Sequence, residues 1–392
     1  MTVFNFTLRA EDDRGAFSDR QFSIKVRNTL VDRYMVVDDT HAYTSLDLIN
    51  WTERPDMGGK AVTYGGGNWM VWRGNNTYRM SPDGINWTQH VAQKEEEGVR
   101  SNIPAFTSCP VWKNDRWFGA TQTGGIHAVY ESVDGITWTL IASNIVTVSV
   151  SYFVATITAA TNGALIINWL PTAASHASLA APYPYVSFDN GRTWEVAIKS
   201  LPAGLVHQNA HYSNQVIHRS SILTFINGLW YYAYSAQRTY YSTSYQNAYA
   251  ARYHYIGYSH DLVNFTRCDT DTISTTAQIG SAWNSSTAIG GNIRDIYYAN
   301  GVLVLDTFSP FGSTAAGHFP TFPAYSVDGR KWTASTLPAP MLQANTTMFT
   351  SQGKVYNFNH AFGTLRVSGD NGRVFAAGAA VPSSTLNDFA RI

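Results

Sequence analysis

The chain has 392 residues, of which 14% are charged and 14% aromatic, and its formal net charge at pH 7 is zero. Globular proteins average about 25% charged residues, and a neutral chain lacks the electrostatic footprint of a protein that binds nucleic acid or acidic membranes. Glu and Lys, both good helix formers, occur 7 times each, whereas Tyr, Phe and Trp supply 23, 19 and 12 strand-favouring residues, so the composition predicts an all-β protein.

Targeting and cysteine signals are few. No apolar run reaches the roughly 18 residues of a membrane helix, and the start MTVFNFTLRAEDD lacks the basic and apolar regions of a signal peptide. We therefore expect synthesis in the cytoplasm and no membrane insertion. Cys109 and Cys268 are too few for a disulfide framework or a zinc site. We expect neither a metal nor a cofactor.

The first 28 residues predict two alternating strands around the Asp-Asp-Arg-Gly turn at 12–15. A lone hairpin is marginal in water, which leaves two alternatives. The hairpin packs on the flank of its own chain, or it docks onto another chain by strand addition. We assign residues 1–29 to this N-terminal hairpin and residues 30–392 to a single domain.

A repeat organises the rest of the chain. Seven segments share an aromatic or apolar residue, then Ser, any residue, Asp, a turn, and Trp or Phe. Their aspartates are Asp47, Asp83, Asp134, Asp189, Asp261, Asp328 and Asp370, and five of them are followed by Trp51, Trp87, Trp138, Trp194 and Trp332. A Gly turn and an apolar strand precede most copies. Each unit reads as four strands, and seven units predict a seven-bladed β-propeller of four-stranded antiparallel blades.

The repeated turn has a structural explanation. Asp accepts hydrogen bonds from N–H groups of its own turn, and Gly or Asn takes the positive-φ position. We therefore expect the seven aspartates and five tryptophans to be structural. The first unit lacks a strand, which the tail at 385–392 can supply, closing the ring and removing exposed sheet edges.

The motif resembles the Asp-box, or BNR, repeat of sialidase-like propellers, with the form Ser-x-Asp-x-Gly-x-Thr-Trp. The segment from Ser187 to Trp194 matches every position, whereas the copies at Asp47 and Asp261 lack the Gly. Copies one residue shorter begin at Ser81, Ser132 and Ser326. The resemblance covers roughly residues 30–392, and it implies that the turns lie on the face away from the binding site.

The N-terminal segment resembles the last two strands of an Ig-like module. Its combination with Asp-box repeats is similar to tail and virion structural proteins of tailed bacteriophages. This resemblance implies a virion protein, with the hairpin contacting other virion or tail proteins and the propeller displayed for attachment or receptor recognition.

The loops opposite the repeated turns are the candidate site. The longest belongs to the fifth unit, where ten Tyr lie between residues 231 and 258. Tyr combines a flat apolar face with a hydroxyl, which suits the recognition of sugars and of proteins. The ligand-binding candidates are the tyrosines expected within the loop and a nearby arginine, namely Tyr240, Tyr241, Tyr245, Tyr249 and Arg238.

Two other residue sets were weighed for chemistry. Histidines recur in the second-to-third loops at His41, His127, His176, His318 and His360; without His-x-x-His spacing we interpret them as structural or solvent-facing. Sialidases bind the substrate carboxylate with three Arg. The arginines that could lie on the binding face are Arg54, Arg73, Arg100, Arg238 and Arg294, but no facing carboxylate pair of the kind glycosidases use is evident.

The sequence thus predicts a non-enzymatic phage virion protein that recognises a surface glycan, with no catalytic residues and no nucleic-acid partner. Two alternatives stay open: a sialidase-like glycoside hydrolase, and a secreted carbohydrate-binding propeller on the extracellular surface.

Overall fold

A computed structural model describes most of the chain, and the regular structure of the described residues is all β-strand. The described residues are 2–11, 17–26, 34–123, 126–145, 153–171, 183–198, 216–241, 248–268, 275–279, 292–308, 324–335, 346–351, 354–359, 364–370, 372, 374–380 and 388–391. Within these ranges no helix is long and apolar enough to cross a bilayer.

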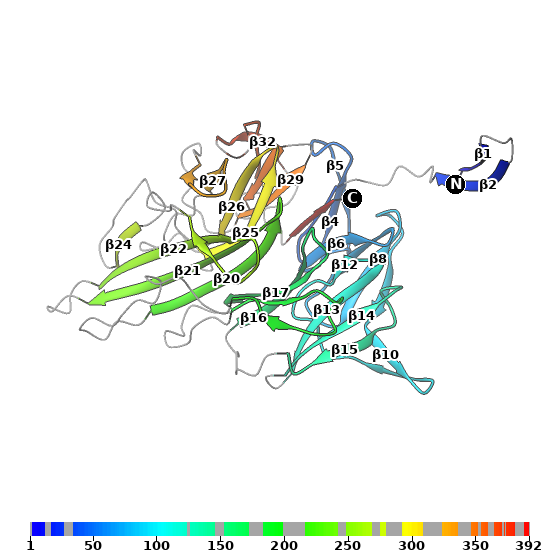
Figure 1. Cartoon of the computed structure of the whole chain (residues 1–392), viewed down its shortest axis with the longest axis horizontal. Helices are drawn as coiled ribbons and strands as arrows, with labels where there is room; N and C mark the ends of the chain where they lie inside the picture. The colour runs from blue at the N-terminus through cyan, green and yellow to red at the C-terminus, as the bar shows by residue number, and fades with distance from the viewer. Residues whose placement is uncertain are drawn as a thin grey trace.

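Antiparallel blades of a β-propeller make up the body of the molecule (Figure 1). The first contains β33 (Asp388–Arg391), β3 (Tyr34–Val37), β4 (Ala42–Ser45) and β5 (Trp51–Arg54). The second contains β6 (Ala61–Gly65), β7 (Asn68–Trp72), β8 (Thr77–Ser81) and β9 (Thr88–Val91). The third contains β12 (Val111–Lys113), β13 (Arg116–Thr123), β14 (Ile126–Ser132) and β15 (Thr139–Ser143).

One large sheet follows the third blade. It contains β16 (Phe153–Ala159), β17 (Leu165–Pro171), β18 (Tyr185–Ser187), β19 (Glu195–Val196), β20 (Val216–Ile226), β21 (Leu229–Tyr241), β22 (Ala248–Ser259), β23 (Thr266–Arg267) and β24 (Thr275–Ile279). The next blade contains β25 (Asn292–Ala299), β26 (Val302–Phe308), β27 (Ala324–Ser326) and β28 (Thr333–Ala334). The last contains β29 (Thr346–Ser351), β30 (Lys354–Asn359), β31 (Thr364–Ser368) and β32 (Ala376–Ala380).

The prediction of seven separate four-stranded blades is wrong. The described strands form six blade sheets, five of four strands and one of nine, because the repeats that contain Asp189 and Asp261 share the large sheet. Trp169 on β17 pairs with Ser221 on β20. Beside it, Asn168 Oδ1 accepts a hydrogen bond from Leu223 N (2.8 Å), and Asn168 Nδ2 donates to Leu223 O (3.2 Å). The side-chain amide of Asn168 thus bonds the backbone of Leu223 as a paired strand residue would, and so joins the two repeats.

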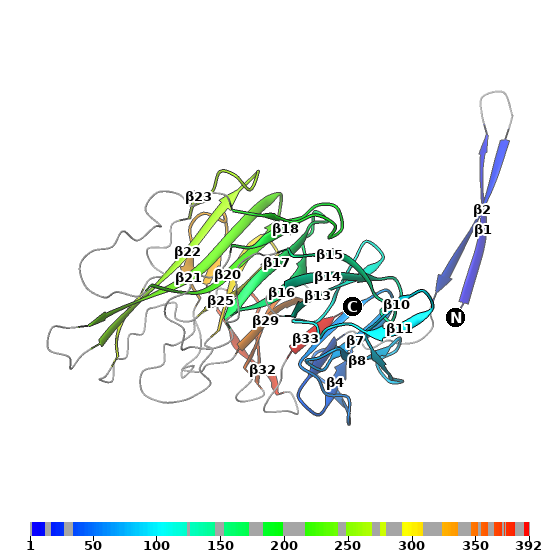
Figure 2. The same cartoon turned by 90° about the horizontal axis from the view of Figure 1, so that it is seen from below.

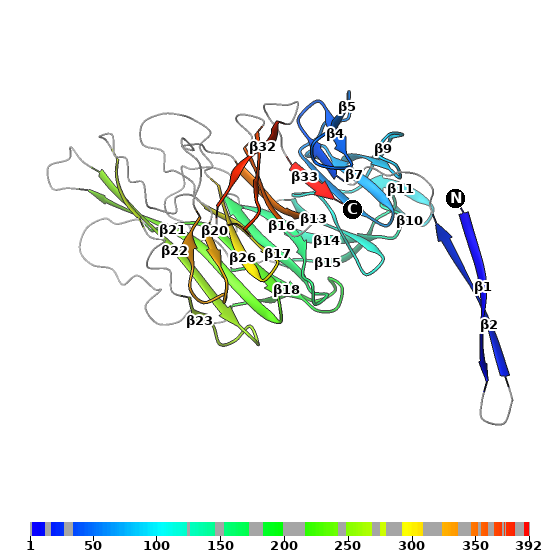
Figure 3. The ribbon, with the colours of Figure 1, turned by 90° about the horizontal axis from the view of Figure 1, so that it is seen from above.

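The predicted closure by the tail is confirmed. Strand β33 pairs antiparallel with β3 along its whole length, from Tyr34↔Arg391 to Val37↔Asp388. The C-terminus therefore completes the blade that the N-terminal part of the repeat region begins (Figure 3).

The core lies between adjacent blades. One cluster joins Met70 and Tyr78 of the second blade to Trp117 and Trp138 of the third. The Tyr78 hydroxyl donates to Gly135 O in the repeated turn of the third blade and accepts from Trp138 Nε1 at 3.1 Å. Aromatic side chains from two sheets therefore pack against one another and also share hydrogen bonds, as a buried Tyr and Trp require.

Two small hairpins lie outside the blade sheets (Figure 2). Among the described strands, β1 (Thr2–Glu11) and β2 (Phe17–Val26) pair only with each other, in a register that runs from Thr2↔Val26 to Glu11↔Phe17. Strands β10 (Gln93–Glu96) and β11 (Val99–Asn102) form the second pair. The two strands expected near the N-terminus are therefore present, and the domain division at residues 29 and 30 stays a prediction.

Candidate functional site

The repeated turns use their aspartates as internal acceptors. Asp47 Oδ1 accepts from Ser45 Oγ (3.1 Å) and from the backbone N–H groups of Ile49 and Asn50 (2.8 Å each). These hydrogen bonds hold the pKa of Asp47 at about 2. In every other copy Oδ1 likewise accepts from the preceding Ser hydroxyl and from the turn backbone, at Asp83, Asp134, Asp189, Asp261, Asp328 and Asp370.

The hydrogen bonds of the repeated turns keep their aspartates ionised. A carboxylate that accepts several hydrogen bonds stays ionised at neutral pH, and the pKa values of Asp83 and Asp189 are also lowered to about 2. Such groups are poor general acids, since the pKa of an effective acid lies near the working pH. Each antiparallel unit also places its repeated turn at the opposite end from its second-to-third connection. The candidate site therefore lies among the second-to-third connections.

The longest of the described strands carry predicted tyrosines. Strands β20, β21 and β22 have 11, 13 and 12 residues and extend beyond the neighbouring blades (Figures 1 and 2). Arg238, Tyr240 and Tyr241 lie on β21, and Tyr249 lies on β22, so these residues belong to strands and not to the loop expected from the sequence. Tyr245 lies outside the described residues.

The register decides which of these residues come together. Tyr240 is directly opposite Tyr249, and Arg238 is opposite Ala251. Because alternate residues of paired strands share a face, Arg238, Tyr240 and Tyr249 occupy one face, and Tyr241 occupies the other. Tyr253 and Tyr255 of β22 pair with Ala236 and Tyr234 and continue the first face.

The base of that face is anchored in the core. Tyr234 is 5% exposed and belongs to a cluster with Tyr232, Trp230 and Phe265. Burial raises the pKa of Tyr234 to about 12, so its hydroxyl is neutral at physiological pH. This face, with Arg238, Tyr240 and Tyr249, thus begins at a packed core and continues along β21 and β22.

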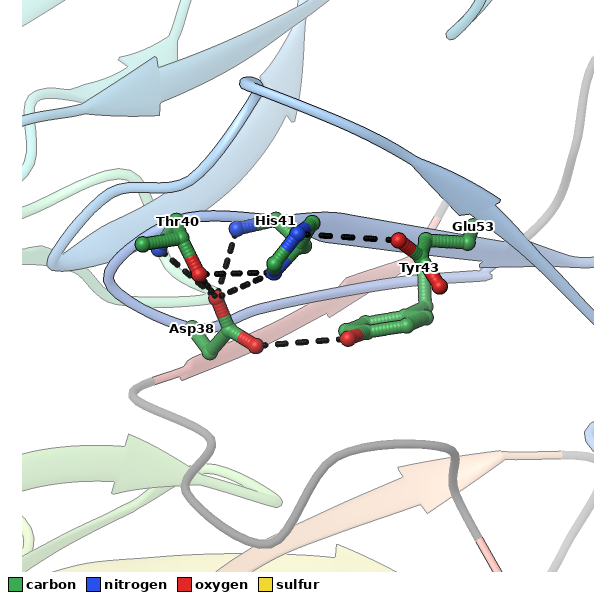
Figure 4. A network of polar contacts seen from close by, with 5 residues as sticks. All are labelled: Asp38, Thr40, His41, Tyr43 and Glu53. Atoms are coloured by element: carbon green, nitrogen blue, oxygen red, sulfur yellow. Dashed lines mark hydrogen bonds and ion pairs between the residues drawn. The ribbon is translucent and has the colours of Figure 1, made fainter.

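A polar network occupies the second-to-third connection of the first blade (Figure 4). Asp38 Oδ1 accepts from the backbone N–H groups of Thr40 (2.7 Å) and His41 (2.5 Å) and from Thr40 Oγ1 (3.0 Å), while Tyr43 OH donates to Oδ2 (3.4 Å). His41 Nδ1 is 2.6 Å from Thr40 Oγ1. Since the Thr40 hydroxyl donates to Asp38, His41 Nδ1 donates to Thr40 Oγ1.

His41 also links two carboxylates. Its Nδ1 is 3.5 Å from Asp38 Oδ1, and its Nε2 is 3.6 Å from Glu53 Oε1 on β5. The side chain is 35% exposed and so reachable from solvent. The sequence indicates His41 but neither carboxylate partner. Asp38 carries only a local signal, the Asp-x-Thr turn, and Glu53 carries none, because the strand pairing of β4 with β5 brings it near.

His127, by contrast, is buried. It lies on β14 at 2% exposure with its ring edge-on to Trp169, 5.0 Å between centroids. Neither ring nitrogen has a hydrogen-bond partner in the described part of the chain, and burial lowers its pKa to about 4. The histidines predicted to share one kind of position therefore differ: His41 is in a polar turn and His127 in an apolar seam, while His176, His318 and His360 lie outside the described residues.

The arginines weighed for a carboxylate clamp do not form one group. Arg100 on β11 pairs with Glu95 on the exposed hairpin, Nε to Oε2 at 3.0 Å. Arg238 lies on β21 and Arg294 on β25, in different sheets. The charge of Arg73 acts on Arg79 of β8, an arginine outside the predicted set. Among the residues with described placement no group of His, Cys, Asp or Glu could hold a metal ion.

Comparisons with known proteins support the fold alone. No protein-family model and no curated protein sequence matches the chain. A periplasmic gluconolactonase from Pseudomonas aeruginosa is 10% identical, with a TM-score of 0.50 and coverage of 91% of this chain and 98% of that one. A putative 6-phosphogluconolactonase from Bacteroides fragilis is 8% identical, with a TM-score of 0.45 and coverage of 94% and 100%. A prolyl endopeptidase is 9% identical, with a TM-score of 0.48 and coverage of 90% and 50%. The first likeness supports the β-propeller, and none of the three transfers an activity.

Proposed function

We propose that this chain is a non-enzymatic binding propeller that recognises a surface glycan on the tyrosine face of strands β21 and β22. The observation that carries the proposal is the register that places Arg238, Tyr240 and Tyr249 on one face of an extended sheet. Sugar rings stack on flat aromatic surfaces, and Tyr adds hydroxyl donors at low entropy cost.

The binding experiment uses the whole chain and polysaccharides from candidate host surfaces, measured by calorimetry and by the release of new reducing ends. We expect binding without new reducing ends. Tyr240→Ala and Tyr249→Ala should each weaken binding about tenfold or more, as the loss of an aromatic contact at the centre of an interface does. Tyr241→Ala, on the opposite face, should have a much smaller effect. Equal losses at all three positions would contradict the assignment of the face.

In the same proposal the chain is an attachment protein of a phage virion, and its repeated turns are Asp-boxes. The N-terminal strand pair supports a docking role, because its register places Phe4 opposite Ile24 and Phe6 opposite Phe22 on one face, and a hairpin with an apolar face needs a partner. Removal of residues 1–28 should abolish incorporation into virions and leave glycan binding intact. Unchanged incorporation would refute the docking role.

A glycoside hydrolase is the second candidate, and the first-blade network favours it. Two carboxylates, Asp38 and Glu53, flank the half-exposed ring of His41, and a histidine held between carboxylates can transfer protons. Release of reducing ends by the whole chain, lost in Glu53→Gln and retained in Glu95→Gln on the exposed hairpin, would establish this candidate over the binding propeller.

A further inference from the structure

Three cationic residues, Lys60, Arg73 and Arg79, lie on the side of the second blade that packs on the first. We call this group the cationic corner and the interface between the two blades the seam. The face of the second blade that packs on the first has Val62 and Val71 at its buried centre. Val71 pairs with Val62 on β6 and with Arg79 on β8, which places Arg79 on the same face. Lys60 precedes β6 and Arg73 follows β7, and backbone hydrogen bonds carry the pairing on to both: Lys60 N donates to Trp72 O (2.7 Å), and Arg73 N donates to Thr77 O (3.2 Å). Lys60 is two residues from Val62 and Arg73 two residues from Val71, so both continue that face towards the connections.

Arg79 is a partly buried cation with a weak partner. Its Nη1 donates to Met57 Sδ at 3.8 Å, and a thioether is a poor acceptor for a guanidinium that has five donors. In the part of the chain that the structure describes, neither Arg73 nor Arg79 makes an ion pair, although Asp56 acts on Arg79 through space. Burial and the charge of Arg73 lower the pKa of Arg79.

The other cation of the corner is neutralised. Lys60 Nζ lies 2.6 Å from Asp39 Oδ1, across the seam. Among the described residues, Asp56 is the one carboxylate whose charge acts on Arg79, and the charge of Arg73 acts on Arg79 in the opposite sense. The corner therefore keeps an excess of positive charge.

The corner is also rigidly built. Gly58 N donates to Thr40 O (3.0 Å) and Gly59 N donates to Asp38 O (2.8 Å), so the segment before Lys60 is fixed to the turn of the first blade. On its other side, a Cβ at Gly59 would lie 2.5 Å from Trp72 O. Met57 and Lys60, at the ends of this segment, are thus held against β7.

We propose that Arg73 and Arg79 form a binding site for an oxyanion, a carboxylate or sulfate group carried by the glycan ligand. Guanidinium groups bind such groups through paired N–H donors and stay charged at all physiological pH values. The identity of the carrier rests on the proposed function, whereas the oxyanion site itself rests on the two arginines and their surroundings.

The first experiment tests the site without any sugar. Thermal unfolding of the whole chain is followed in sodium sulfate and in sodium chloride of equal ionic strength. Sulfate stabilises proteins in general. The measured quantity is therefore the rise in Tm from chloride to sulfate, compared between wild type and the double variant Arg73→Gln/Arg79→Gln. Bound ligand raises stability by mass action, so wild type and the control Arg100→Gln should show a larger rise than the double variant. An equal rise in all three proteins would overturn the proposal.

The second experiment identifies the carrier. Affinities are measured for an oligomer of uronic acids, its carboxyl-reduced neutral form, and a sulfated form of the neutral oligomer. Wild type should prefer one acidic form about tenfold or more over the neutral form, and the double variant should lose that preference, since a hydrogen bond to a charged group is worth about 1.5–3 kcal/mol. The form that is preferred separates carboxylate from sulfate.

These results separate the site from the proposed function. Tyr240→Ala/Tyr249→Ala should weaken acidic and neutral oligomers alike, whereas the arginine variant changes only the preference between them. If no oligomer binds and the sulfate effect is still lost in the double variant, the glycan function fails and the oxyanion site stands. Equal affinity of wild type for all three oligomers would overturn the assignment of a glycan oxyanion.

Discussion

His127 should make the stability of this propeller fall as the pH falls from about 7 to about 4. The side chain is 2% exposed, packs edge-on against Trp169, and has no hydrogen-bond partner among the described residues. Burial lowers its pKa from 6.5 to about 4. In this pH range the unfolded chain binds the proton that the folded chain excludes, so the free energy of unfolding decreases as the pH is lowered.

The size of the effect follows from the two pKa values. The difference between 6.5 and about 4, at about 1.4 kcal/mol for each pH unit, amounts to about 3 kcal/mol. The full stability of the neutral form is present above about pH 7, and the loss is complete near pH 4. The turn aspartates act at lower pH. Their pKa values fall from 3.8 to about 2 on folding, as at Asp47 and Asp189, so the stability that they contribute is lost mainly below about pH 4, and a measurement above pH 4.5 is dominated by histidine.

The assay is urea unfolding of wild type and His127→Phe at intervals between pH 4.5 and 7.5. Phe keeps a ring against Trp169 and cannot take up a proton, so the stability of the variant should fall less steeply with decreasing pH than that of wild type. A smaller slope should remain, because burial also lowers the pKa of His90. The same exchange at exposed His260 should keep the acid dependence of wild type. If His127→Phe loses stability as steeply as wild type, the buried neutral histidine is not its cause.

Three further substitutions, one of them with a matched control, test the contacts between repeats. Tyr78→Phe removes the hydroxyl that donates to Gly135 O and accepts from Trp138 Nε1; leaving these buried groups unpaired should cost about 2–3 kcal/mol in chemical denaturation, and a loss below 0.5 kcal/mol would contradict the role. Gly329→Ala places a Cβ 2.1 Å from Tyr231 Oη at φ +71, whereas the Cβ of Gly228→Ala at φ +78 meets nothing within 4 Å. Gly228→Ala should cost only the left-handed penalty of about 1–2 kcal/mol. Gly329→Ala should lower the Tm clearly more than Gly228→Ala does. Asn168→Leu removes the amide that bonds Leu223 N and Leu223 O, so hydrogen exchange at the Leu223 amide should accelerate; unchanged protection there would show that the amide does not join β17 to β20.

The local features of this protein were set by its sequence alone. In each repeated turn the Ser, the Asp and the turn backbone lie within about four residues of one another, as in Ser187, Asp189 and Thr193, so the hydrogen bonds form without help from distant parts of the chain. The strand-favouring composition likewise needs no tertiary structure to be read. The pairing of the tail with β3 was predictable because a repeat that lacks one strand must obtain it elsewhere.

The number of sheets and the grouping of side chains were decided by tertiary structure. Asn168 bonds Leu223 from 55 residues away, which merges two repeats that look independent in the sequence. Tyr240 shares a face with Tyr249 and not with its neighbour Tyr241, because strand register and not sequence proximity selects the face. Arg79 lacks an ion pair among the described residues because the fold seats it over Met57 and the apolar seam. Such contacts depend on how distant strands pack, and no local pattern records them.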